Sequence, residues 1–322
     1  MQSKREDEMT ADVAPLFQTL RVRGKVFRNR IVMPPMVVLH GLTGPSGIEW
    51  YARRARGGAA LVIVESTAAN RFVNELTAEN LKPLVDGIHH YGALAAIQLS
   101  PMTRGARIAP ADLDRQQIES VVCHYRIAAQ ACVEAGFDGV EPHGAHGYLL
   151  NQFFSPTQNQ RVDEYGGSQE NRMRLALRLI RELRPILGED RLLLYRHTPV
   201  GPGYDIADSL ALAKRLVAEG VDILDLSPSS IDAPGDRAAP FRTLGVPVIA
   251  VNHLDDVARA VEALTAGRAD LVAVGRGLIA DPDWPNKVRE GRLGEIVPCV
   301  KCDEGCHGHL DRGEPVACTQ WE

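Results

Sequence analysis

The sequence predicts an α/β protein, a (β/α)8 TIM barrel with a short cysteine-rich extension at its C-terminal end. Eight short apolar runs alternate with amphipathic helical patterns along most of the 322 residues. The runs are rich in Val, Ile and Leu and lack polar alternation, which is typical of strands buried on both faces of a parallel sheet. Four of the six cysteines fall within residues 299–318, after the last run.

The predicted strands are each followed by a crossover, as in a barrel. They are residues 30–33, 61–65, 94–99, 139–141, 192–196, 223–226, 248–251 and 271–274. Eight such units favour a closed barrel over a doubly wound sheet. No G-x-G-x-x-G follows any of these strands, so the sequence predicts no dinucleotide-binding Rossmann domain.

Between the strands, apolar residues recur with the spacing of one helical face. A helix ending before Gly267 is predicted from Leu254, Val257, Ala258, Val261 and Leu264. Glycine commonly ends helices, and the same pattern precedes Gly220. Another helix is predicted for residues 116–135, in which Cys123 and Cys132 are expected to be buried apolar residues rather than ligands.

The composition excludes several classes of protein. Apolar residues make up 45% and charged residues 24% of the chain, and the net charge of −5 gives no general attraction for nucleic acid or anionic membranes. Residues 1–14 lack the apolar segment of a secretory signal and are expected to form a flexible tail. Since the chain has no run of 18 apolar residues, we expect a soluble, cytoplasmic protein without a membrane span.

Polar residues gather where the predicted strands end, which is where TIM barrels carry their chemistry. They are Gln98 at the end of the third strand, His143 and His146 after the fourth, Arg196 at the end of the fifth, and Gly275 and Arg276 after the eighth. This agreement between position and chemistry predicts an active site at that end of the barrel.

His143, His146 and Tyr148 are the most informative group. Two imidazoles and a phenol within six residues can polarise a carbonyl and deliver a proton, provided that another group supplies a hydride. The alternative is a loop whose histidines cap helices or bind backbone groups.

The C-terminal cysteines have the spacing C-x2-C-x3-C-x11-C, formed by Cys299, Cys302, Cys306 and Cys318. In a cytosolic chain, clustered thiolates are metal ligands more often than disulfides. Zinc sites usually pair two C-x2-C knuckles, and this spacing does not. Zinc stays an alternative because His307 and His309 are nearby.

The segment HGAHGYLLNQFFSP, followed by NQRVDEYGGSQENR, closely resembles the Old Yellow Enzyme family of FMN-dependent ene-reductases. It is most similar to the branch that includes 2,4-dienoyl-CoA reductase and trimethylamine dehydrogenase, and the likeness runs from about Pro15 to the end. The resemblance implies an FMN-binding barrel over residues 15–295. It also implies that the four cysteines of residues 296–322 hold a [4Fe–4S] cluster.

The same resemblance assigns the flavin contacts. Pro34, Pro35, Met36 and Val37 would lie against the isoalloxazine ring, the Ser66 backbone at its C4 edge, Gln98 at the pyrimidine edge, Arg196 near N1 and O2, and Asn252, Gly275 and Arg276 at the phosphate. For Arg196 the alternative is a salt bridge at the barrel rim.

Three departures from the family pattern stand out. Asn252 and His253 occupy a position that is usually a glycine pair in the phosphate cradle. Val37 stands where trimethylamine dehydrogenase carries the cysteine bonded to FMN, so FMN should be non-covalent. Pro101 and Thr103 replace the usual His and Gly of the Q-L-x-H-x-G-R motif, in which Arg104 remains.

The resemblance implies hydride transfer to the C=C bond of an α,β-unsaturated carbonyl substrate, an enone or an enoyl- or dienoyl-CoA-like compound. Electrons would come from a separate ferredoxin or flavoprotein through the cluster, or directly from NAD(P)H, and a homo-oligomer is expected. One alternative is an amine dehydrogenase of the trimethylamine type, although those relatives carry Tyr at the position of His143. The other is a non-catalytic electron-transfer subunit.

Overall fold

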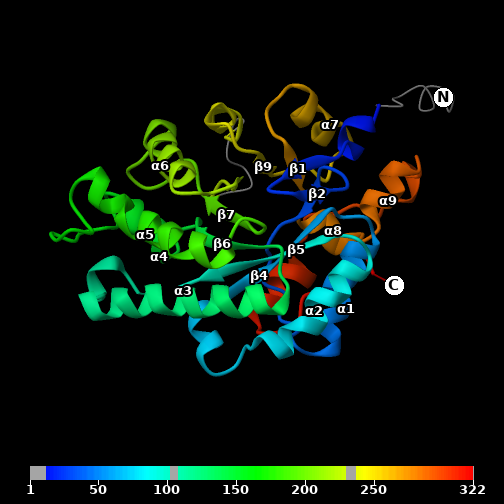
Figure 1. Ribbon diagram of the computed structural model, residues 1–322. Helices are drawn as coiled ribbons and strands as arrows, with labels where there is room; N and C mark the ends of the chain where they lie inside the picture. The colour runs from blue at the N-terminus through cyan, green and yellow to red at the C-terminus, as the bar shows by residue number, and fades with distance from the viewer. Residues whose placement is uncertain (1–11, 102–107, 230–236, 322) are drawn as a thin grey trace.

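The computed structural model describes residues 12–101, 108–229 and 237–321. Its centre is a closed barrel of parallel strands in the order β10-β3-β4-β5-β6-β7-β8-β9 (Figure 1). These are β3 (Ile31–Met33), β4 (Leu61–Ala68), β5 (Leu94–Ser100), β6 (Gly139–Gly144), β7 (Leu192–His197), β8 (Ile223–Leu226), β9 (Val248–Val251) and β10 (Leu271–Ala273). All eight correspond to the predicted strands, so the barrel is confirmed.

A hairpin closes the N-terminal end of the barrel. Its strands, β1 (Leu20–Val22) and β2 (Lys25–Phe27), pair antiparallel before the barrel begins. The Phe27 side chain is fully buried in a cluster with Leu61, Leu192 and Leu271, which begin three of the barrel strands. The opposite, C-terminal end of the strands is therefore the end left for a site.

Helices surround the barrel (Figure 1). The α-helices are α1 (Pro45–Arg56), α2 (Ala78–His90), α3 (Arg115–Ala135), α4 (Leu149–Phe154), α5 (Gln169–Leu187), α6 (Ile206–Ala218), α7 (Val257–Thr265), α8 (Arg276–Ala280), α9 (Trp284–Arg289) and α10 (His309–Asp311). Local sequence fixes their ends. In α3, the Asp114 side chain accepts a hydrogen bond from the Gln117 backbone N–H, and Gly136 adopts φ +97° after the last turn.

Two details of the helix predictions are wrong. The helix α7 begins at Val257 rather than Leu254, because the Asp256 side chain caps it by accepting the Arg259 backbone N–H. On α3, Cys132 is buried as expected, but Cys123 is exposed. A 21-residue helix packed on one side must turn some of its apolar residues outward, and Cys123 lies on that outer face.

After α9, the cysteine-rich segment returns to the barrel. Figure 1 shows this segment in red, beside α1 and α8. The Val316 backbone N–H donates to the Val38 carbonyl at 2.9 Å, in the loop that follows β3. The Trp321 indole N–H donates to the Ala280 carbonyl at the end of α8, at 3.1 Å. These contacts hold the segment against the C-terminal end of the barrel.

Among the described residues, no helix combines the length and the apolar character that a membrane crossing requires.

Candidate functional site

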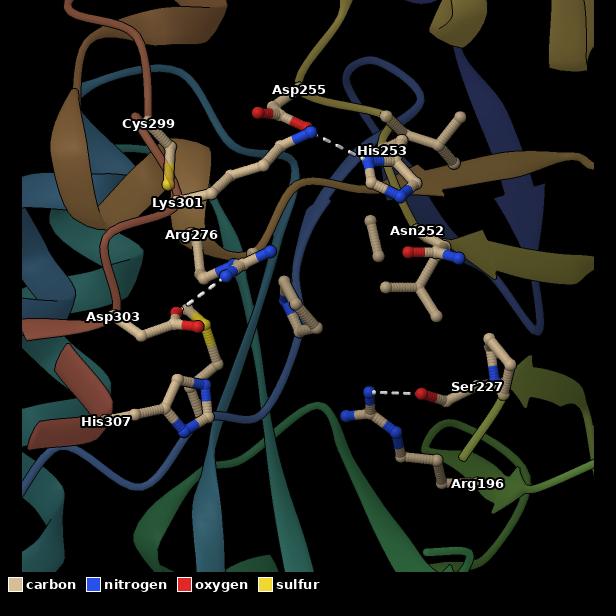
Figure 2. Close-up of a pocket in the computed structure, with 17 residues that line it drawn as sticks. Arg196, Ser227, Asn252, His253, Asp255, Arg276, Cys299, Lys301, Asp303 and His307 are labelled. Carbon is tan, nitrogen blue, oxygen red and sulfur yellow. Dashed lines mark hydrogen bonds and ion pairs between the residues drawn. The ribbon is translucent and has the colours of Figure 1, made fainter. Parts of the chain in front are cut away.

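A cavity of about 410 Å³ lies at the C-terminal end of the barrel (Figure 2). The predicted flavin residues that line it are Pro34, Met36, Arg196, Asn252, Gly275 and Arg276. They follow or end β3, β7, β9 and β10, so the fold brings together residues that are up to 242 positions apart in the sequence (276 − 34). The cysteine segment completes the wall with Cys299, Lys301, Asp303 and His307.

Arg196 is buried at one end of this cavity and is held by three groups. Its guanidinium donates to the Ser227 hydroxyl at 3.1 Å and to the Pro35 carbonyl at 3.3 Å. Its Nε lies 3.5 Å from the Asp225 carboxylate. The alternative considered for Arg196 was a salt bridge at the barrel rim. Arg196 does pair with Asp225, but both residues are buried inside the end of the barrel, and Arg196 also lines the cavity.

Arg196 belongs to a row of buried polar residues that crosses neighbouring strands. Strand register pairs Gln98 with Glu141, and Arg196 with Asp225. The Gln98 amide donates to the Glu141 carboxylate at 2.8 Å. Burial, followed by repulsion from Asp225, raises the pKa of Glu141 well above its usual value, and burial raises the pKa of Asp225.

The two histidines meet beside this row. His143 lies within β6, whose extension to Gly144 corrects the expectation that it follows the strand, and register places it opposite Arg196. The rings of His143 and His146 are 5.3 Å apart, and the Tyr148 ring lies 4.8 Å from that of His143. The fold thus assembles the predicted catalytic group.

His146 is fixed from both sides. Its backbone has φ +59°, a left-handed conformation that is uncommon outside glycine. Its backbone N–H donates to the Thr198 hydroxyl at 2.9 Å, and its Nε2 lies 2.8 Å from the Ser227 hydroxyl. Ser227 therefore links His146 to Arg196.

Both imidazoles are held neutral. Burial lowers the pKa of His146 to about 3, with a further contribution from the positive charge of Arg196. Burial also lowers the pKa of His143 well below its usual value, and His146 and Arg196 add to the effect. Within the described part of the chain, the buried His143 Nδ1 has no hydrogen-bond partner. Such a site can offer uncharged N–H donors to a ligand oxygen.

The four C-terminal cysteines line one small space of about 20 Å³ together with Arg276. None of the described cysteines forms a disulfide. In residues 12–101, 108–229 and 237–321, no three Cys, His, Asp or Glu side chains have the arrangement for a single metal ion. The space borders the larger cavity, since Arg276, Cys299, Lys301 and Asp303 line both.

The remaining predicted residues occupy other positions. Val37, Ser66 and Gln98 lie outside the wall of the large cavity, and Pro35 acts through its carbonyl. Thr103 and Arg104, like residues 1–11 of the predicted tail, lie outside the described residues.

Two groups of site residues were missed. Asp225 lies near the end of the sixth barrel strand and Ser227 directly follows it, so the same rule that found Arg196 could have found them in DLSPSS. Lys301, Asp303 and His307 reach the cavity only because the C-terminal segment folds back. No residue spacing in the sequence predicts that the C-terminal segment contacts the cavity.

The cavity has features that suit a flavin phosphate. Asn252 and His253 have φ values of +101° and +54°, so both adopt the left-handed backbone that a glycine pair would adopt without strain. Gly275 and Arg276 line the same cavity, and Arg276 lies across it from them (Figure 2). At the other end, the buried Arg196 Nε has no hydrogen-bond partner among the described residues.

Comparison with known proteins decides the family. Residues 15–109 and 102–295 match the NADH:flavin oxidoreductase / NADH oxidase family. The chain belongs to this family. The resemblance to the Old Yellow Enzyme family is thereby confirmed.

The chain is 35% identical to an NADH oxidase of Thermoanaerobacter brockii, over 91% of the chain and 53% of that protein. It is 28% identical to a cinnamate reductase of Clostridium sporogenes, over 94% of the chain and 57% of that protein. The chain thus spans about half the length of these relatives. The structure of an old yellow enzyme homologue from Zymomonas mobilis superposes with a TM-score of 0.74 at 25% identity, covering 86% of this chain and 92% of that one.

Proposed function

We propose that this protein is a flavin-dependent oxidoreductase that reduces the activated C=C bond of an α,β-unsaturated carbonyl compound. The observation that carries the proposal is the pair of neutral imidazoles, His143 and His146, beside Tyr148 at the end of the barrel. FMN, when bound in the adjoining cavity, supplies the hydride. The similarity to a cinnamate reductase supports a substrate of this class.

In this proposal, the histidine pair binds the carbonyl oxygen of the substrate. Both donate N–H hydrogen bonds that strengthen as negative charge develops on that oxygen, and each such donor is worth roughly 10²–10³ in rate. Ser227 and Thr198 keep His146 in place, so little reorganisation is needed during the reaction. Arg196 supplies positive charge where a reduced flavin would gather negative charge.

Tyr148 is proposed to protonate the α-carbon. It follows the histidines at the start of α4, and 46% of its surface is exposed. An exposed phenol can donate its proton and recover one from solvent without a relay.

The decisive experiment is anaerobic re-oxidation of the reduced enzyme by a panel of enones, enoyl thioesters and methylated amines. Rapid oxidation by the unsaturated carbonyl compounds supports the proposal. Turnover of amines alone would indicate an amine dehydrogenase. If neither class reacts while an electron acceptor does, the chain is an electron-transfer subunit.

We further propose that Cys299, Cys302, Cys306 and Cys318 hold a [4Fe–4S] cluster. The support is that all four line one small space, and that a four-iron cluster separates its thiolates more widely than a single ion does. Anaerobically purified protein should contain four iron and four sulfide per chain. Cys302→Ser should lose them, whereas Cys123→Ser, on the outer face of α3, should retain them. Zinc in place of iron would contradict the proposal.

The electron source follows from the same arrangement. We propose a separate ferredoxin or flavoprotein that delivers electrons through the cluster, because the cysteine segment borders the flavin cavity. Anaerobic stopped-flow mixing with NADH or NADPH tests this proposal. Fast bleaching of the flavin by either nucleotide would show that no protein donor is required.

A further inference from the structure

Lys301 is an unusual residue in the cysteine segment. It lies between Cys299 and Cys302, and its backbone has φ +57°. A left-handed backbone is strained for a long side chain, and such outliers often occur where a side chain must be aimed at a ligand. Lys301 is an exposed residue, yet it lines the large cavity, where its ammonium lies 3.2 Å from His253 Nδ1.

The charges around the cavity leave Lys301 available for an anion. Its permanent cations are Arg196, Arg276 and Lys301, and its carboxylates are Asp255 and Asp303. Arg276 is already paired with Asp303 at 2.6 Å. Within the described residues, the hydrogen bond that the structure gives Lys301 goes to an imidazole, which neutralises no charge.

The position of Lys301 identifies the anion. It approaches His253, which together with Asn252 forms the left-handed turn at the phosphate end of the cavity (Figure 2). Arg196 and Ser227 lie at the other end, where the flavin ring is expected. We infer that Lys301 binds the phosphate of FMN, so the cysteine segment supplies part of the cofactor site. The inference rests on FMN occupying this cavity, as in the proposed function.

This arrangement couples two sites. A correctly folded cysteine segment places Lys301 and sets how much of the Arg276 charge is left for the phosphate. Conversely, bound FMN holds Lys301 and with it the segment, since a ligand stabilises whatever conformation binds it.

The test measures binding, which does not depend on any substrate. FMN and riboflavin are titrated into the flavin-free full-length protein, because riboflavin lacks only the phosphate. Lys301→Gly removes the ammonium and suits the left-handed backbone, so the segment should still fold. We expect its FMN affinity to fall about tenfold, the loss of one charge-assisted hydrogen bond, with riboflavin affinity unchanged. Lys301→Arg should retain most of the FMN affinity.

Asp303→Asn provides a test of opposite sign. It releases Arg276 from its carboxylate, and asparagine tolerates the φ of +59° at this position. FMN affinity should rise several-fold without a change for riboflavin. Arg312→Ala is the control, because Arg312 lies in the same segment but outside the cavity wall, and it should change neither affinity.

Equal losses of FMN and riboflavin affinity in Lys301→Gly would overturn the inference, since they would assign Lys301 to the ring or to folding. An unchanged FMN affinity would overturn it as well. If instead the protein binds FMN through Lys301 but reduces no enone, the proposed function fails and this inference stands.

Discussion

The two ends of the cavity are built in different ways. At the end where the flavin ring is expected, Arg196 lines the cavity, and strand register aligns it with His143 and Asp225 on the neighbouring strands; all three are buried. At the phosphate end, His253 belongs to a strained turn and Lys301 to an exposed segment that returns from the C-terminus. The first group is therefore positioned by the barrel strands themselves, whereas the position of Lys301 depends on how the C-terminal segment packs against the barrel.

Replacing both His143 and His146 by Ala should abolish the binding of the substrate carbonyl without affecting the phosphate end of the cavity. We expect the largest effect on activity from this change. Removal of two preorganised donors should lower kcat/KM for enone reduction by about 10⁴ or more. FMN should stay bound, because neither histidine lines the large cavity. Stopped-flow oxidation of the reduced variant measures the loss, with His90→Ala on the exposed surface of α2 as control. Unchanged kcat/KM in a flavin-loaded double variant would remove the pair from the mechanism.

Tyr148→Phe distinguishes the role of the Tyr148 hydroxyl as a proton donor from the packing role of its ring. The ring contact with His143 is kept and only the hydroxyl is lost. Oxidation of the reduced enzyme by an enone should slow by about 10², the range for loss of a general acid, while reduction of the flavin by its donor stays normal. If enone reduction is as fast as in the unmodified protein, solvent or another residue is the acid.

The two ends also differ in how far the sequence predicts them. Buried strands and the polar residues at their ends leave a local signal, so the barrel and Arg196 could be predicted from apolar runs and position. Ser227 carried the same signal and was missed because serine is common in loops. Lys301 could not be predicted, since its role depends on a fold-back contact with His253, 48 residues earlier in the chain.

Ser227→Ala tests the hydrogen bonds that connect His146 with Arg196. Ser227 contacts both His146 and Arg196, and we regard it as a positioning residue. We expect kcat to fall about tenfold, the equivalent of one or two neutral hydrogen bonds, with little change in KM. Ser227→Thr should recover most of the rate because it restores the hydroxyl. A purely structural role would instead lower stability and leave kcat unchanged in the protein that stays folded.

The smallest expected effect on activity is that of pH. Because burial lowers the pKa of His146 to about 3 and that of His143 well below its usual value, both should stay neutral from pH 8 to about 5. Enone reduction by the pre-reduced enzyme should therefore show no loss from protonation of the pair near pH 6.5. A tenfold fall in kcat/KM per pH unit below 6.5, absent from a variant that lacks the pair, would show that these imidazoles titrate normally.

Stability should respond to pH where activity does not. Burial also lowers the pKa of His197, to about 4. Below pH 6.5 the unfolded chain binds protons at these three imidazoles and the folded protein does not, so the free energy of unfolding should fall as pH decreases from 6.5 towards 4. Each histidine contributes up to about 1.4 kcal/mol per pH unit. Urea unfolding of the FMN-loaded protein at pH 7.5, 6.0 and 5.0 measures this slope. It should be shallower in the variant without His143 and His146, whereas an equal slope would place the acid sensitivity elsewhere, including the phosphate end.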